Sequence, residues 1–318
     1  MNPLIGTCNQ PHCHPDTGCA LGERLQECSH FSARTGDASE TITTAEGEGV
    51  PWTGSAFGLD DIVWLASRQR PFLCAPIGAY NAGKTTFLTA LYIGLCRGIV
   101  PKSHQFAGTF TFGGWEKLAA YLRHSPQGIG PGFPPHTPVT DSRLPGWLHV
   151  GLRRANDEII DLLLADAPGE WFSRWSIRPH GDGTDGARWV IEHSDSFLLF
   201  VDSAALSGPD RRVVANQTEL LARRLASSLA GRPVAVVWAK SDAEVPPTIK
   251  RDLETALNSA LPEGRIFRTS VYPMPDASEP TRSFWNTIEY FLGWEITPVP
   301  LPVVAPVVAT DPFLAYRG

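Results

Sequence analysis

The sequence contains no run of about 18 apolar residues, the length needed to span a membrane, and it has no surplus of positive charge. The apolar stretch 298–309 is interrupted by Pro298, Pro300, Pro302 and Pro306, which excludes a helix there. A formal net charge of -6 provides no broad basic face for phosphate backbones. The first residues lack the basic start and apolar core of a signal peptide. We therefore expect a cytoplasmic protein with no membrane span and no nucleic-acid partner.

Several catalytic signatures are also missing. There is no Gly-x-Ser-x-Gly motif and no Cys/His catalytic arrangement. The nine histidines show no metal-triad spacing outside the N-terminus, and no internal repeat is present. The sequence therefore gives no indication of a nucleophilic hydrolase or of a repeat architecture.

Six cysteines are present, and four of them, Cys8, Cys13, Cys19 and Cys28, lie close together. Four thiolates are the number that a closed tetrahedral Zn²⁺ site requires, and a segment with so few large apolar residues would need a metal to hold it. The spacing differs from the common Cys-x2-Cys knuckle, and His14 or His30 can replace a thiolate. Unbound thiols in a mobile N-terminus and a redox role are the alternatives. The other two cysteines, Cys74 and Cys96, are expected in the core.

The pattern of apolar runs divides the chain into four parts. We expect a zinc-binding module over 1–30, a linker over 31–57, a P-loop domain over 58–294 and a Pro-rich extended tail over 295–318. Within the domain, short apolar runs alternate with segments of helical spacing, for example at 211–229 and 247–261. This alternation predicts an α/β fold with a mainly parallel sheet flanked by helices.

The most specific motif is Gly-x-x-x-x-Gly-Lys-Thr at residues 78–85, between a predicted strand at 71–77 and a predicted helix at 85–96. Such a loop turns its backbone N–H groups toward phosphate oxygens, and the dipole of the following helix favours the same anion. Lys84 would reach the outer phosphates and Thr85 would ligate Mg²⁺. An ordinary Gly-rich turn before a helix is the alternative. The nucleotide contacts predicted here are Gly78, Asn81, Ala82, Gly83, Lys84, Thr85 and Thr86.

Two later motifs each follow a predicted strand. Asp166-Ala167-Pro168-Gly169 resembles the Asp-x-x-Gly element of GTPases, although a simple turn is the alternative. Ala239-Lys240-Ser241-Asp242 resembles the guanine-reading Asn/Thr-Lys-x-Asp element, with Ala in the first position, and a surface turn is the alternative. A carboxylate at Asp242 can accept two hydrogen bonds from guanine, whereas adenine offers no such pair of donors.

The order of these motifs makes residues 70–293 resemble the TRAFAC-class, or Ras-like, GTPases. Residues 82–92, 106–112 and 161–170 resemble more narrowly the bacterial double-GTPase-type domains, which are associated with multi-gene conflict or defence systems. The resemblance implies GTP/GDP and Mg²⁺ as ligands and other proteins of the same system as partners. It implies that Asp166 holds Mg²⁺ through water, that Gly169 contacts the γ-phosphate, and that the backbone near Ser270 contacts the base.

The residues that would sense or hydrolyse the γ-phosphate are less defined. The resemblance places a γ-phosphate and Mg²⁺ sensor near Thr109 or Thr111, of which we favour Thr109. Glu170 stands where a Ras-like protein has the glutamine that orients the attacking water, and its charge opposes that of the phosphate. No arginine has positional support as a charge-stabilising finger. Trp171 and Trp175 follow directly; they are interpreted as core residues or as a partner surface.

The sequence therefore predicts a GTP-dependent switch with slow hydrolysis, to which Glu170 and Lys84 contribute and which a partner accelerates. An ATP-hydrolysing P-loop enzyme and a non-hydrolysing nucleotide-binding scaffold are the two alternatives.

Overall fold

Six consecutive buried residues form the central strand of the sheet, β3 (Phe72–Ile77). A strand that is covered on both faces has apolar residues at every position, because successive side chains point to opposite sides. Leu73 and Ala75 enter the core on one face of the sheet, whereas Phe72 and Cys74 enter the core on the other. Cys74 is 1% exposed and is therefore a core residue, as predicted, and this burial raises the pKa of its thiol to about 12.

The computed structural model describes residues 6–8, 31–33, 54–123, 145–272 and 280–293. The chain divides into two compact units, residues 1–50 and 51–318. In the first unit, β1 (Gly6–Cys8) pairs antiparallel with β2 (Phe31–Ala33). The other elements, in chain order, are α1 (Leu59–Ala66), β3, α2 (Lys84–Cys96), β4 (His104–Gly108), α3 (Phe112–Arg123), β5 (Gly146–Arg154), β6 (Ile159–Asp166), α4 (Gly169–Ile177), α5 (Asp185–His193), β7 (Ser196–Asp202), α6 (Ser203–Ser207), α7 (Arg211–Ala226), β8 (Val234–Ala239), α8 (Pro247–Ala260), β9 (Arg265–Arg268) and α9 (Pro280–Leu292).

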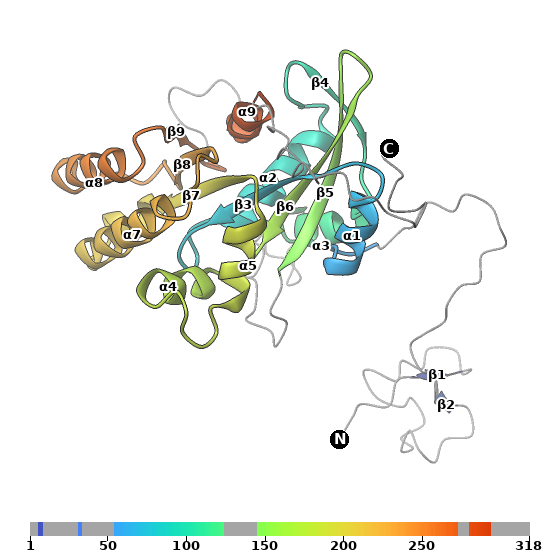
Figure 1. Ribbon diagram of the computed structural model, residues 1–318, viewed down its shortest axis with the longest axis horizontal. Coiled ribbons are helices and arrows are strands. Elements are labelled where there is room, and N and C mark those ends of the chain that lie inside the picture. Colours follow the sequence, from blue (N-terminus) through green and yellow to red (C-terminus); the bar gives the residue numbers. More distant parts are fainter. Residues whose placement is uncertain (1–5, 9–30, 34–53, 124–144, 273–279, 294–318) are drawn as a thin grey trace, which may run out of the picture. The chain divides into compact units, whose positions relative to one another are not determined.

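In the described part of the second unit, seven strands form one sheet in the order β4-β5-β6-β3-β7-β8-β9 (Figure 1). The five strands from β6 to β9 are parallel, and β4 and β5 join them antiparallel at one end. The predicted α/β fold with a mainly parallel sheet is therefore confirmed. The carboxyl ends of the parallel strands open at one edge, and ligands bind at that edge in folds of this kind.

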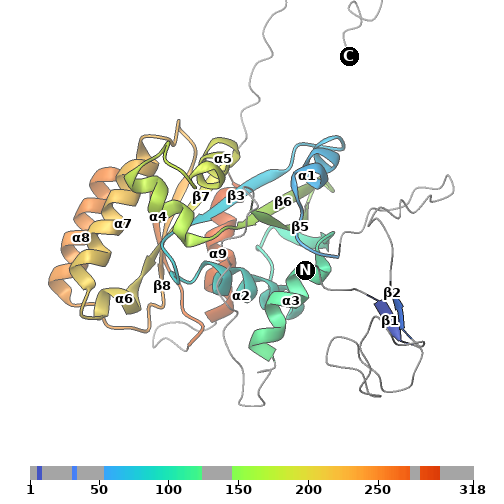
Figure 2. The same cartoon turned by 90° about the horizontal axis from the view of Figure 1, so that it is seen from below.

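Helices cover both faces of the sheet (Figure 2). One core contains side chains of α1, α4, α5, α6, α7 and α8, and the other contains side chains of α2, α3 and α9. The Trp285 indole donates a hydrogen bond to the Leu91 carbonyl, which fixes α9 against α2. None of the helices in the described ranges is both long enough and apolar enough to cross a membrane.

Two predictions about individual side chains are settled by burial. Cys96 is exposed at the end of α2, so the prediction that it lies in the core was wrong. Trp171 and Trp175 are buried, which agrees with the core interpretation rather than with an exposed partner surface.

A Cβ atom at Gly186 would lie 2.5 Å from the Trp171 ring, so α5 packs on α4 without any intervening side chain.

Several predictions fall outside the described residues. Of the four cysteines of the predicted zinc site, only Cys8 is described, in β1, and Cys13, Cys19 and Cys28 are not. The residues that the structure does describe contain no group of three or more potential His, Cys, Asp or Glu metal ligands. Residues 34–53, most of the predicted linker, and the tail 295–318 also lie outside. Phe57, at the end of that linker, is buried and pairs with Trp147 of β5.

Candidate nucleotide-binding site

The predicted motifs all follow the carboxyl ends of neighbouring parallel strands. The phosphate loop follows β3, Asp166 ends β6, and Lys240 follows β8. Because β6, β3, β7 and β8 are adjacent in the sheet, segments that are distant in sequence meet at this one edge. The sheet order therefore assembles the candidate site.

The backbone of residues 78–83 makes the turn that a phosphate loop needs. Asn81 and Gly83 have positive φ values of 57° and 93°, and glycine and asparagine tolerate this region best. A Cβ atom at Gly78 would lie 2.9 Å from the Phe200 Cβ atom of β7, so the first glycine is required by close packing. The loop ends where α2 begins at Lys84, and the positive end of this 13-residue helix faces the loop.

Lys84 is buried inside the loop, with 7% of its surface exposed. Its Nζ atom donates hydrogen bonds to the carbonyl oxygens of Gly78, at 3.0 Å, and Ala79, at 2.9 Å. Burial lowers the pKa of the Lys84 ammonium to about 8, and the nearby carboxylates of Asp166 and Glu170 oppose this shift. A phosphate group would replace the two carbonyl contacts with contacts to an anion.

Thr85 and Asp166 meet beside the loop, where the Thr85 hydroxyl donates a hydrogen bond of 3.0 Å to Asp166 Oδ1. Hydroxyl and carboxylate oxygens are the ligands that Mg²⁺ prefers, and Mg²⁺ at such sites is held by one or two protein oxygens together with phosphate oxygens. This pair therefore fits a Mg²⁺ ion that is shared with a bound nucleotide.

Gly169 begins α4 in direct contact with the phosphate loop. A Cβ atom at Gly169 would lie 2.4 Å from the Tyr80 nitrogen and 2.5 Å from the Ala79 oxygen, so no larger residue fits without displacing backbone. Glu170 follows in the first turn of α4, and its Oε2 atom is buried without a hydrogen-bond partner in the structure. The carboxylate of Glu170 is also close enough to act electrostatically on Lys84.

Thr109 is not brought to this cluster. Its hydroxyl donates a hydrogen bond of 2.6 Å to the carbonyl oxygen of His149 in β5. His149 lies opposite Leu163, three residues before Asp166 in β6. At about 3.3 Å per residue, this places Thr109 roughly 10 Å along the sheet from the carboxylate that would hold Mg²⁺.

On the other side of the loop, Lys240 connects three segments. Its Nζ atom donates hydrogen bonds of 2.7 Å to Asp202 Oδ2 and of 2.7 Å to the Asn81 carbonyl oxygen. Asp202 also accepts a hydrogen bond from the Ala205 backbone nitrogen and so caps α6. The extended side chain of Lys240 therefore lies between the phosphate loop and the end of β7.

Asp242 is held by the loop that follows β9. The Ser270 hydroxyl donates a hydrogen bond of 2.5 Å to Asp242 Oδ1. Ser241 donates to the Thr269 carbonyl oxygen through both its backbone nitrogen, at 3.1 Å, and its hydroxyl, at 3.0 Å. The predicted residues Lys240, Asp242 and Ser270 are thus brought together in two hydrogen-bonded loops.

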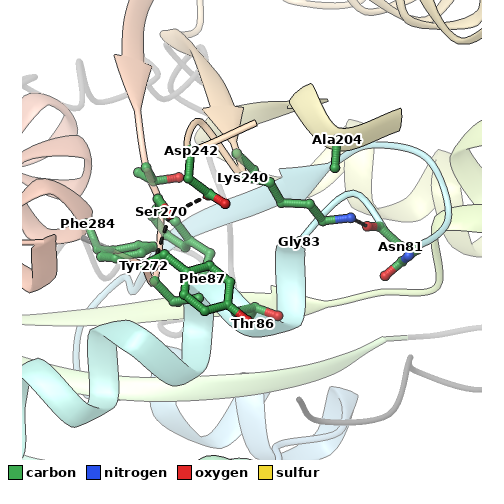
Figure 3. A pocket seen from close by; sticks show the side chains of 13 residues that line it. Asn81, Gly83, Thr86, Phe87, Ala204, Lys240, Asp242, Ser270, Tyr272 and Phe284 are labelled. Carbon is green, nitrogen blue, oxygen red and sulfur yellow. Dashed lines mark hydrogen bonds between the residues drawn. The ribbon is translucent and has the colours of Figure 1, made fainter. Parts of the chain in front are cut away.

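A pocket of about 350 Å³ lies between these loops and the start of α2 (Figure 3). Asn81, Gly83 and Thr86 line its phosphate-loop end. Lys240, Asp242 and Ser270 line it on the side of β8 and β9, and Phe87 and Phe284 provide apolar walls. The pocket is therefore continuous with the phosphate loop, as a site for a nucleoside attached to phosphates must be.

Two residues of the site were not predicted from the sequence. Asp202 is the polar residue that ends the apolar run 197–201, and this position was the available signal. Tyr272 lines the pocket two residues after Ser270 and donates its backbone N–H to the Ser270 hydroxyl at 3.0 Å. No pattern in the sequence distinguishes this tyrosine from a surface residue.

Comparison with known proteins agrees with this arrangement. No curated protein matches the chain. A protein-family model described as Double-GTPase 2 matches residues 73–286, about two thirds of the chain, and this range includes the phosphate loop and both later motifs. The chain therefore belongs to the Double-GTPase 2 family, a family of GTPase domains.

Proposed function

We propose that this protein is a GTP-binding regulatory switch with slow Mg²⁺-dependent GTP hydrolysis. The observation that carries the proposal is the pocket that joins the phosphate loop to Asp242 and Lys240. Asp242 keeps acceptor capacity for two guanine N–H groups, because a carboxylate has about four lone-pair sites and Ser270 occupies one. Adenine offers no matching donor pair and would leave the remaining acceptor sites of this carboxylate unpaired inside the pocket.

The phosphate half of the site would bind the triphosphate through Lys84, the loop backbone and the start of α2. Thr85 and Asp166 would hold Mg²⁺, which supplies positive charge to the phosphate oxygens. The buried Lys84 ammonium would add a second positive charge from the protein itself.

Slow intrinsic hydrolysis is expected from the residues near the γ-phosphate position. Glu170 can orient a water molecule, but its negative charge raises the energy of the anionic phosphate beside it. Thr109 contacts His149 rather than the Thr85–Asp166 pair. A partner that supplies positive charge or reorders these segments would then accelerate the reaction.

The switching element would be α4. Its first residue, Gly169, contacts the phosphate loop at Tyr80, so gain or loss of the γ-phosphate would move the helix. Partner proteins of a bacterial multi-component system, such as the conflict and defence systems with which double-GTPase-type domains are associated, would read this movement. A structural Zn²⁺ ion held by Cys8, Cys13, Cys19 and Cys28 remains a prediction.

The proposal is tested by calorimetric titration of the nucleotide-stripped protein with GTP and, separately, with ATP in the presence of Mg²⁺. We expect a clear preference for GTP, followed by slow release of phosphate in a single-turnover assay. Lys84→Ala should lose both nucleotides. Equal or tighter ATP binding would instead identify an ATP-using P-loop enzyme. Retained GTP without any turnover, even with a partner present, would identify a scaffold.

A further inference from the structure

Three aromatic residues line the pocket, and they differ sharply in exposure. Phe87 is 1% exposed and Phe284 is 3% exposed, so both rings are already packed in the core. Tyr272 is 54% exposed although it lines the same pocket. Tyr272 is therefore the pocket aromatic with the largest exposed fraction, and a ligand in the pocket could cover part of that surface.

We propose that Tyr272 is a base-contacting residue whose ring packs on one face of the bound guanine, opposite the aliphatic stem of Lys240. This inference rests on the proposed GTP-binding function and specifies how the base is held. In Figure 3, Asp242, Ser270 and Tyr272 lie on one side of the pocket, and the extended Lys240 side chain lies on the other. A planar base between them would present its edge to Asp242 and its faces to Tyr272 and Lys240.

A single hydroxyl fixes the spacing between the edge contact and the face contact. The Ser270 hydroxyl donates to Asp242 and accepts the backbone N–H of Tyr272. The Tyr272 backbone is thus held relative to the carboxylate before any nucleotide binds. Preorganisation of this kind reduces the entropy that binding would otherwise cost.

The two contacts have different chemical signatures. A hydrogen-bonding carboxylate distinguishes bases by their edges, whereas an aromatic ring stacks on any base because every base has a π-face. Removal of the Tyr272 ring should therefore weaken binding of different nucleotides by similar factors. Inosine triphosphate, which lacks the 2-amino group of guanine, is a suitable second ligand.

The test compares Tyr272→Ala and Tyr272→Phe by calorimetry with GTP and with inosine triphosphate. We expect Tyr272→Ala to weaken both nucleotides by about tenfold or more, with their affinity ratio unchanged. Tyr272→Phe should stay within about twofold of the wild type, because the stacking ring is kept. Phe106→Ala is the matched control, since Phe106 is a 47% exposed aromatic on β4, at the opposite end of the sheet from β9.

Three outcomes would overturn the proposal. These are unchanged GTP affinity in Tyr272→Ala, an equal loss in Tyr272→Phe, and a changed ratio between the two nucleotides. Thermal melting without nucleotide checks that the variants fold. If the wild type prefers ATP, the proposed function fails, but a loss of ATP affinity in Tyr272→Ala would still support the face contact. If the wild type binds GTP selectively and only the tyrosine variants have no effect, the face contact alone is wrong.

Discussion

The substitution Asp242→Asn would convert the proposed base-reading acceptor into a mixed acceptor and donor while keeping its shape. Asp242 Oδ1 accepts the Ser270 hydroxyl, and an asparagine Oδ1 can accept the same hydrogen bond. The other carboxylate oxygen becomes an NH₂ group, which cannot accept the N–H groups of guanine. The local framework should therefore survive while the recognition of guanine is lost.

The magnitude follows from the contacts that change. Hydrogen bonds to a charged group contribute about 1.5–3 kcal/mol each, and an N–H group that faces another N–H group leaves both without a partner. We therefore expect GTP binding to weaken by about 3 kcal/mol, roughly a hundredfold. Xanthosine triphosphate carries an oxygen where guanine carries its 2-amino group, so the new NH₂ group can donate to it. The variant should bind this nucleotide more tightly than the wild type does.

The assay is competition of GTP and xanthosine triphosphate against a fluorescent guanine nucleotide, with wild type and variant side by side. Asp252→Asn is a matched control, because Asp252 lies in α8 with an exposed side chain paired to Arg251. Its nucleotide affinities should equal those of the wild type. Unchanged GTP affinity in Asp242→Asn, with a wild-type melting temperature, would refute the assignment of this pocket to guanine.

Three further predictions concern the phosphate half of the site. Gly169→Ala should reduce GTP affinity at least tenfold in a calorimetric titration, because its Cβ atom would lie 2.4 Å from the Tyr80 nitrogen. The control Gly58→Ala, whose Cβ atom would have its nearest contact at 3.8 Å, should bind GTP normally in the same titration. Burial lowers the pKa of Lys84 to about 8 without nucleotide, and a bound phosphate would raise this pKa, so GTP affinity should fall as the pH rises past about 8. Calorimetry in two buffers at about pH 9 should show that GTP binding takes up protons. Absence of this proton uptake would contradict the burial argument. Glu170→Gln removes the negative charge near Lys84, so GTP should bind more tightly and single-turnover hydrolysis should not slow. Slower hydrolysis would instead mean that the carboxylate acts as a base.

The parts of the fold that were predictable are those determined by local sequence. The apolar run 72–77 and the following Gly83-Lys84 motif specify a strand, a turn and a helix within a short stretch of chain. The turn after β6 and the turn after β8 were located in the same way, because each follows an apolar run. Their convergence depends on the sheet order, which places β6, β3, β7 and β8 side by side with their carboxyl ends at the same edge.

The parts that were missed depend on contacts between distant segments. The Thr109 hydrogen bond to His149 depends on the β4–β5 register, which shifts between Phe106 and Gly108. Helices α4 and α5 are only nine residues each, too short for their periodicity to stand out beside a glycine-rich connection. Tyr272 lines one pocket with Phe87 of α2 and Phe284 of α9, which are distant in sequence, and spacing alone does not show this.

The contact between Trp171 and Gly186 determines how far a change at the nucleotide would extend across the surface. Because the indole lies directly on the α5 backbone, a tilt or slide of α4 would be expected to carry α5 along. In the proposed switch, the area that differs between the two nucleotide states would then be the combined outer surface of both helices. A partner could distinguish these states from a position well away from the phosphates, and it need not touch either buried tryptophan to do so.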